Sequence, residues 1–282
     1  MFLRLLLLEK DKLAGRLVLW IELGILALAI VLVDVIEYLI AVNNSGPATT
    51  ALEQNLAWPH SAITSVNFSE AHSLGGILIV IIIAVVTARE YSWRTFHLWL
   101  SRGVSRLALM GAKSVVIIAL SLVLVLTSLI VGLIVTAILT LLLHGSLQLS
   151  QDNVQQLVLN FLAIDLGLLP YAALTFMFTI LFRNLAASMS IVLVLLLLVE
   201  SILYETSLAL GNTTIAQAAQ YLPVGLSNGI NTAIFDSQGA NTAIIPNVHY
   251  ATPLVACIGL LAYTIIFAGI GIWRFSRQNF TD

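Results

Sequence analysis

Charge is scarce in this chain. Of its 282 residues, 9% are charged and 60% are hydrophobic, and the mean hydropathy is +1.02. A soluble core cannot bury so large an apolar share, and stretches such as GGILIVIIIAVVTA and SIVLVLLLLV are apolar on every side of a helix. Cysteine is nearly absent as well, because Cys257 is the only one. A disulfide within the chain and a cysteine metal cluster are therefore excluded, and the composition predicts an integral membrane protein.

Nucleotide-binding and hydrolytic motifs are also absent. The sequence contains no G-x-x-x-x-G-K-[ST], and the fragment GAKS at residues 111–114 lacks the first glycine and the Gly-Lys step of that motif. H-E-x-x-H, C-x-x-C and G-x-S-x-G are missing too. We therefore expect a chain that is not an enzyme, binds no cofactor or metal, has no nucleic-acid partner and does not hydrolyse a nucleotide itself.

Six apolar segments account for most of the hydrophobic residues. A spanning helix needs about 20 predominantly apolar residues, because the hydrocarbon core of a bilayer is about 30 Å thick. The alternating ten-residue strands of a membrane barrel are absent. We predict a single all-α transmembrane domain over residues 1–282, in which the short second segment starts near His72. The predicted spans are residues 18–40, 74–89, 112–142, 156–182, 185–204 and 251–273.

The lysines and arginines orient these spans. All twelve precede the first span, follow the sixth, or lie between the second and third or the fourth and fifth. The other connections, near residues 43–72, 143–155 and 205–250, contain no lysine or arginine. The positive-inside rule then places both termini in the cytoplasm, in a multi-pass protein of the cell membrane of a prokaryote.

Two further segments are expected at the membrane surface. Over residues 1–17, the stretch FLRLLLLEKDKLAGR sorts its apolar and basic residues onto two helical faces, which predicts an interfacial helix in contact with membrane lipid. A frayed tail is the alternative. Residues 205–250 form a long outer loop before the sixth span. Its apolar patch IAQAAQYLPVGL predicts either short interfacial or re-entrant helices or a packed irregular loop.

The connection between the second and third spans gathers positive charge. Residues 89–113 hold five of the twelve basic residues, and residues 91–102 are predicted to form a short amphipathic helix. Gly103 permits a break after it, and Ser105 is placed to cap the next helix. Periodicity alone favours an interfacial helix whose tryptophans lie among lipid headgroups. The residues that would share its apolar face, at spacing i, i+3, i+4 and i+7, are Trp93, Phe96, His97 and Leu100.

Acidic residues within the spans form a second set of candidates. An acid at the bilayer centre costs about 2.5–3.5 kcal/mol on insertion scales, and the outer halves of the spans contain no lysine or arginine to offset that cost. Two interpretations stay open: a polar patch in a translocation path for cationic or amphiphilic cargo, or acids that hydrogen-bond between packed helices or face water. The residues are Asp34, Glu37, Asp165 and Glu200.

Residues 90–113, EYSWRTFHLWLSRGVSRLALMGAK, resemble the first cytoplasmic loop of type-2 ATP-binding-cassette exporter permeases. In that family an acid ends the second span, and a threonine, a leucine-rich turn, a Pro/Gly-Val-Ser-Arg step and a lysine follow. Arg94 stands where the family usually has glycine. The layout is also similar, with a basic N-terminus, six spans and a long loop that contains Tyr221-Leu222-Pro223. The matching residues are Glu90, Thr95, Leu98, Leu100, Gly103, Val104, Ser105, Arg106 and Lys113.

The resemblance implies that residues 91–102 are a coupling helix that docks on a separate cytoplasmic ATP-binding subunit. That subunit would bind ATP and Mg, and a second permease copy, identical or similar, would complete the transporter. The cargo would be a hydrophobic or amphiphilic lipid, peptide or drug. The residues expected to couple to the ATPase are Glu90, Trp93, Thr95, Phe96, Leu100, Arg102, Gly103, Ser105 and Arg106.

Two other classes of function stay open. A stand-alone secondary transporter would use Asp165 as its ion-linked acid, although the sequence has no inverted repeat with paired broken helices. A membrane-embedded enzyme or a scaffold is the third class, and the absence of a histidine deep in any predicted span argues against most such catalytic sites. Transport without ATP would favour the secondary transporter, and activity without an ATPase partner would favour the enzyme.

Overall fold

The computed structural model describes residues 2–43, 58–143, 146–148, 150–209, 213–236 and 250–278. Every regular element within these ranges is a helix. Six helical stretches are long and apolar enough to cross a membrane, which confirms the predicted all-α, six-span architecture in outline. These stretches are Leu17–Asn43, His60–Ser92, Arg106–Leu142, Gln151–Phe182, Leu185–Ser207 and Pro253–Ser276.

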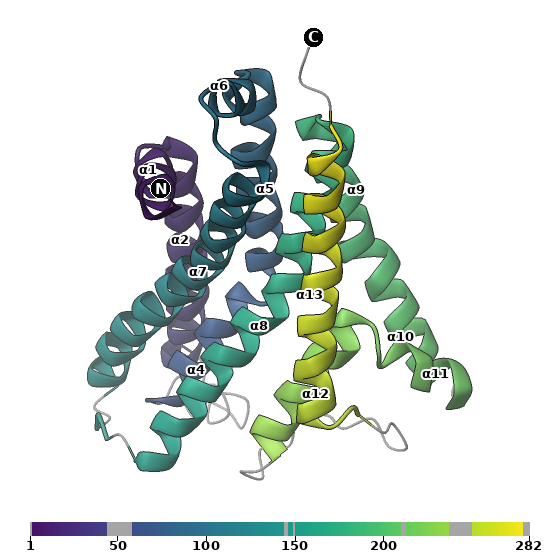
Figure 1. The fold of residues 1–282 in the computed structure, drawn as a ribbon. Helices are drawn as coiled ribbons and strands as arrows, with labels where there is room; N and C mark the ends of the chain where they lie inside the picture. The colour runs from purple at the N-terminus through teal and green to yellow at the C-terminus, as the bar shows by residue number, and fades with distance from the viewer. Residues whose placement is uncertain are drawn as a thin grey trace.

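The long helices run between two ends of the bundle (Figure 1). One end carries α1 (Phe2–Ala14), α6 (Thr95–Ser101) and the C-terminal end of α13 (Pro253–Ser276). The opposite end carries α4 (His60–Val66) and α12 (Pro223–Asp236). We refer to these as the α6 end and the α12 end. Both ends of the described chain therefore lie at the α6 end.

The first span, α2 (Leu17–Asn43), lies at the edge of the bundle. Only 22% of its most apolar stretch is buried, against 72% for the second span. One stripe, recurring mostly at every fourth residue, faces α5 (Leu74–Ser92) and α7 (Arg106–Leu142), and most of the remaining leucines and isoleucines are exposed. This is the pattern of a helix that packs on one side and faces lipid on the others. The buried residues are Glu22, Leu26, Ile30, Asp34 and Ala41.

The segment before the second span is more than a connection. Residues 60–69 were expected in an outer loop, yet they form α4 and the short helix η1 (Asn67–Ser69), and α4 packs against α7. The approach is close because Gly132 has no side chain: a Cβ at this position would lie 2.6 Å from Ser65 Cβ. The next helix, α5, then begins at Leu74, close to its predicted start.

The core of the bundle is built around α5 and α8 (Gln151–Phe182). In the span that contains α5, 72% of the most apolar stretch is buried, and in α8 the share is 61%. The corresponding share for α13 is 17%. The helix α8 continues through Pro170 and packs along α13. Among the largest fully buried side chains are Ile79, Ile83, Phe96, Leu109, Met110, Leu168, Phe176 and Phe275.

The fifth span combines three helical segments, α9 (Leu185–Val194), the π-helical turn η2 (Leu195–Glu200) and α10 (Ser201–Ala209). It follows a tight turn in which Arg183 adopts a left-handed backbone with φ of 53°. Asn184 then caps α9, as its Oδ1 accepts from the Ala187 N–H at 3.2 Å. The turn predicted between the fourth and fifth spans is confirmed.

The described part of the segment 205–250 is helical. After α10 come α11 (Thr213–Ala219) and α12, and α12 packs against both α8 and α13. Short helices are therefore correct for this part, and an irregular loop is wrong. Residues 237–249, which the predicted loop also included, lie outside the described residues.

Candidate functional site

The connection between α5 and α7 contains a helix that is shorter than predicted. The preceding helix, α5, continues to Ser92, and Arg94 adopts a left-handed conformation with φ of 52°. Because this residue interrupts the helical path, α6 begins only at Thr95 and ends at Ser101. The helix predicted over residues 91–102 thus has its ends misplaced, although a short helix is present.

The end of α6 follows the predicted pattern. Gly103 has a φ of 77°, in the left-handed region that favours glycine, and the chain turns there. Ser105 Oγ accepts a hydrogen bond from the Ala108 N–H at 3.3 Å and so caps α7. The break at Gly103 and the cap at Ser105 are both confirmed.

Phe96 fixes α6 to the bundle. Its side chain is 1% exposed. Its ring packs edge-on against Tyr91, with centroids 4.8 Å apart, and against Phe275 at 5.0 Å. The Lys113 ammonium lies 5.7 Å from the Phe96 centroid. One side chain of α6 therefore contacts α5, α7 and α13 together.

The four residues predicted to share one apolar face do not share it. Trp93 lies in the turn before α6 and is 64% exposed, and His97 is exposed too. Phe96 is buried, whereas Leu100 is half-buried. The prediction is wrong because Arg94 breaks the helical register, so the i, i+3 spacing between Trp93 and Phe96 does not place them on one side.

A buried ion cluster joins α1, α5 and α7 beside α6. Lys113 Nζ donates to Glu9 Oε2 and to Glu90 Oε1, each at 2.8 Å. Lys12 Nζ lies 2.9 Å from Glu9 Oε1 and 3.6 Å from Glu90 Oε1. Two ammonium groups thus balance two carboxylates, which is the arrangement that buried charges require. The Lys12 ammonium also lies 5.4 Å from the centroid of the Trp99 ring on α6.

Glu9, like Lys12, is a member of the cluster that was not predicted as a site residue from the sequence. Burial raises the pKa of its carboxyl, but Lys113 and Lys12 outweigh burial, so the pKa lies below its ordinary value. Leu5, Glu9 and Leu13 are buried at i, i+4 spacing. An acid on the apolar face of α1 was the available signal, and it went unused because the helix was assigned to lipid.

Arg106 connects the same region to the end of α13. Its Nη1 donates to the carbonyl oxygens of Ser276, at 2.6 Å, and Gln278, at 2.8 Å. The Gln278 side chain in turn donates to the Ile180 carbonyl at 2.9 Å and accepts from the Tyr91 hydroxyl at 3.1 Å. Arg106 therefore stabilises a helix C-terminus within the bundle.

The outward side of the connection is apolar and basic. Leu98 is 53% exposed, and the Arg89 guanidinium lies 5.7 Å from the exposed Trp93 ring. Thr95 is half-buried beside it, and Glu90 is buried in the ion cluster. The exposed residues, which we name the α6 surface, are Trp93, Arg94, His97, Leu98, Ser101, Arg102 and Gly103.

Asp34 belongs to a polar contact between α2 and α4. Ser65 Oγ donates to Asp34 Oδ2 at 3.3 Å and to the Ser61 carbonyl at 2.8 Å. Thr136 of α7 extends the chain, since its hydroxyl donates to Ser61 Oγ at 3.2 Å. Glu37 is half-buried one turn further along α2 and adds negative charge near Asp34. These contacts suit a packing role for Asp34.

Asp165 is buried in α8 and has fewer contacts. The Ser121 hydroxyl of α7 is its hydrogen-bonding neighbour. Its Oδ1 is buried and has no hydrogen-bond partner among the described residues. This carboxyl is therefore less fully satisfied than that of Asp34 or Glu200.

Glu200 connects η2 to α8 and α12. The Tyr171 hydroxyl donates to its Oε2 at 2.7 Å, and the Val224 N–H donates to its Oε1 at 2.8 Å. His72 Nε2 lies 3.8 Å from Oε2. The π-helical turn places Glu200 at this junction, where it holds the first turn of α12.

A second carboxylate also holds α12. Asn231 Nδ2 donates to Glu70 Oε1 at 3.0 Å. Local sequence patterns carry little signal for Glu70 or Tyr171, because both act across long separations in the chain. The predicted path acids fall at three separate places with no described contact between the places, namely Asp34 with Glu37, Asp165, and Glu200.

Within the ranges that the structure describes, no group of three His, Cys, Asp or Glu side chains is close enough to hold a metal ion. His144 and His249, two histidines of the outer segments, lie outside these ranges.

Fold and site together define the class: a multi-pass α-helical membrane protein with a short helix fixed over a buried ion cluster at one end. The sequence matches the family described as "Protein of unknown function (DUF2705)" over residues 25–281. The chain belongs to this family. The match includes α6 and most or all of every span, and it begins after α1. No curated protein matches the chain.

Proposed function

We propose that the chain is the permease subunit of an ATP-driven exporter and that α6 is its coupling helix. The observation that carries the proposal is the mounting of α6. Phe96 and the ion cluster fix the helix to α1, α5, α7 and α13, whereas the α6 surface is exposed. The resemblance of residues 90–113 to exporter permeases supports the same assignment.

Rigid mounting suits a helix that transmits force. A push on α6 reaches α5 and α13 through the Phe96 ring stack, and reaches α1 and α7 through Lys113. Close-packed contacts pass displacement on instead of absorbing it. Movement of an attached subunit would therefore move several spans together.

The chemistry of the α6 surface specifies the partner. Exposed aromatic and leucine side chains flanked by arginines fit an apolar groove with an acidic rim. Such a groove would lie on a cytoplasmic ATP-binding subunit that holds ATP and Mg, so this chain itself would be neither enzyme nor cofactor carrier. The α6 end would then face the cytoplasm of a prokaryotic cell. A second permease copy, identical or similar, would complete the path for a hydrophobic or amphiphilic cargo.

Complex formation with a cytoplasmic ATPase subunit, which we expect a neighbouring gene to encode, tests the proposal. The variant Leu98→Ala with Arg102→Glu removes an apolar contact and reverses a charge on the α6 surface without touching Phe96 or the ion cluster. We expect affinity for the ATPase subunit, measured with purified proteins, to fall roughly ten-fold or more. Lys10→Glu is the matched control, because Lys10 is also exposed at the α6 end but lies on α1. Equal binding by the control, the double variant and the wild type would refute the coupling role.

A stand-alone secondary transporter is the second candidate, and the free Oδ1 of Asp165 favours it. A buried carboxyl with an unused oxygen can exchange a proton or bind a cation during transport. Transport into ATP-free vesicles, driven by a proton gradient and abolished by Asp165→Asn, would select this function. Transport that requires ATP and survives Asp165→Asn would select the exporter.

A further inference from the structure

A groove lies between α8, α12 and the start of α13 at the α12 end. Two adjoining cavities of about 540 and 520 Å³ form it, and Gln155, Leu159 and Ile234 line both. Each volume falls within the range of small-molecule sites. The groove is separate from α6 and the ion cluster, which lie at the other end of the bundle (Figure 1).

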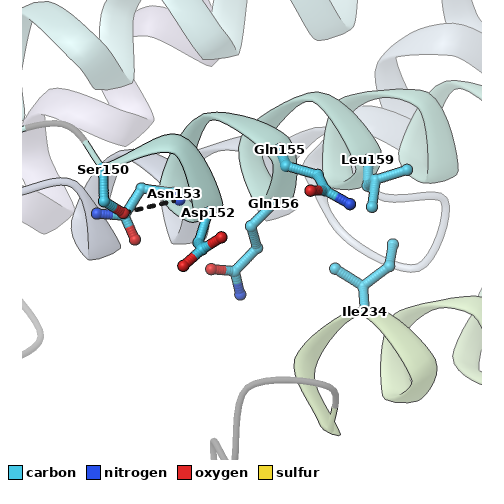
Figure 2. A pocket seen from close by; sticks show the side chains of 7 residues that line it. All are labelled: Ser150, Asp152, Asn153, Gln155, Gln156, Leu159 and Ile234. Atoms are coloured by element: carbon cyan, nitrogen blue, oxygen red, sulfur yellow. Dashed lines mark hydrogen bonds between the residues drawn. The ribbon is translucent and has the colours of Figure 1, made fainter.

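The first cavity is polar (Figure 2). Asp152 and Gln156, one turn apart on α8, direct their side chains into it. Gln156 is 7% exposed and makes no hydrogen bond with any residue that the structure describes. The amide atoms open onto the cavity, so they are available to hydrogen-bond an occupant. Its free amide therefore points to an occupant with hydrogen-bonding groups.

The second cavity is apolar and continues from the first. Its wall on α8 faces the wall formed by α12 and the start of α13. Among its described lining residues, Cys257 is the only one with a polar side-chain atom beyond the shared Gln155. The remaining lining residues that the first cavity lacks include Leu162, Ala163, Leu166, Ile230 and Ala233.

The charge of the groove has one sign. Asp152 is the charged residue lining the two cavities. Residues 114–182 and 184–273, from which the groove is built, contain no lysine or arginine. The polar half therefore attracts cations and disfavours anions.

The expected depth of the groove in the bilayer agrees with its having one polar and one apolar half. The helix α8 has 32 residues and is about 48 Å long, whereas the hydrocarbon core is about 30 Å thick. Its first residues, QDNVQQ, are polar, and the apolar run follows them. The polar cavity thus falls among headgroups or in water, and the apolar cavity extends toward the hydrocarbon.

We propose that this groove binds a single-tailed primary amine, with the ammonium group at Asp152 and Gln156 and the tail along Leu162 and Ala233. A primary ammonium supplies the N–H donors that the carboxylate and the amide oxygen accept, which a quaternary ammonium cannot do. The assignment of this amphiphile as cargo rests on the proposed exporter function. The binding itself does not, so it is measured on the chain alone.

The test uses the full chain in phosphatidylcholine nanodiscs and a dodecylamine probe with a photoreactive diazirine in its tail. We expect saturable labelling of peptides from α8, α12 and the start of α13, with competition by dodecylamine but weak competition by dodecanol and dodecyl sulfate. Asp152→Asn should weaken dodecylamine by roughly two- to five-fold, the range of an exposed ion pair, and leave dodecanol unchanged. Ala233→Leu should weaken both, because it fills the apolar half.

Glu205→Gln is the matched control, since Glu205 is exposed on α10 and does not line the groove. Gln156→Leu removes the other polar contact to the ammonium group and should also weaken dodecylamine binding. Thermal melting checks that each variant is folded. Labelling outside the groove, equal binding of amine and alcohol, or an unchanged Asp152→Asn variant would overturn the site. Competition by phosphatidylethanolamine would show that the groove binds a membrane lipid, and this would overturn the assignment of a single-tailed amine. If the chain binds the amine but does not couple to an ATPase, the result would support the groove as an amine site. It would contradict only the proposed exporter function.

Discussion

At the scale of single residues, Lys113 is the buried charge that holds the ion cluster together. Its ammonium is buried, and it is the group that both Glu9 and Glu90 contact at 2.8 Å. The two carboxylates come from α1 and α5, so three helices meet at one charge. Removing that charge would leave two buried carboxylates with the partly exposed Lys12 as the ammonium still in contact with them, and with Arg16 as a further nearby cation.

We predict that Lys113→Met lowers the free energy of unfolding by about 3–5 kcal/mol, the cost of breaking a buried ion pair. Lys12→Met should cost less, because 31% of the Lys12 side chain is exposed and water screens its charge. Thermal unfolding in detergent, followed with a thiol-reactive dye on Cys257, measures both. Equal melting temperatures for the two variants would contradict the central position of Lys113.

The pKa of Glu9 predicts a dependence on pH. This pKa is lowered in the folded protein, so the carboxylate stabilises the fold above the ordinary carboxyl value. The contribution is lost as pH falls through the folded pKa. The stability difference between wild type and Glu9→Gln should therefore be largest near neutral pH and shrink below the ordinary value. A difference that grows on acidification would contradict the ion cluster.

The roles of single residues were predictable from the sequence where neighbours in the chain determine them. Gly103 and Ser105 act within one turn, and both were correct. Trp93 and Phe96 were wrongly placed on one face, because periodicity gives which residues share a side but not where a left-handed residue breaks the register. Glu9 lies 104 residues from Lys113, and no local pattern predicts such a pair.

At the scale of elements, α12 is held by side chains from outside itself. Glu200 accepts from the Val224 N–H in its first turn, and Glu70 accepts from Asn231 two turns later. The N-terminal N–H groups of a helix lack partners within the helix, so the Glu200 carboxyl satisfies one of them.

We predict that Glu200→Ala accelerates hydrogen exchange at the start of α12 roughly ten-fold or more, because the hydrogen bond to the Val224 N–H is lost there. The Val224 amide and its neighbours should respond most. Glu205→Ala, five residues further along the chain on α10, should leave the exchange unchanged. Mass spectrometry of exchanged peptides from both variants measures this, and equal protection in the two would contradict the tether.

The long helices were predictable from the sequence, whereas α4 was not. Each span is an apolar run whose length is set by the bilayer, so its existence follows from composition. By contrast, α4 has seven residues, HSAITSV, of which four are polar. Its burial depends on Gly132 of α7 and on hydrogen bonds to Asp34 and Thr136, which are tertiary contacts.

At the scale of the whole molecule, two chemically different ends are separated by an apolar bundle. The α6 end carries the lysines and arginines, the ion cluster and both ends of the described chain. The α12 end carries buried carboxylates, short helices and the groove. In the exporter that we propose, the first end would receive force and the second would hold cargo.

The most direct measurement is a cross-link from α6 in native membranes. In a Cys257→Ser background, Leu98→Cys places the only thiol on the α6 surface, where a thiol-reactive benzophenone can be attached. We predict that light joins this position to the ATPase subunit, whereas a probe at Ile138→Cys, which is exposed on α7 toward the α12 end, does not react with it. Absence of an ATPase adduct at Leu98→Cys, with full labelling of the thiol, would contradict the coupling role of α6.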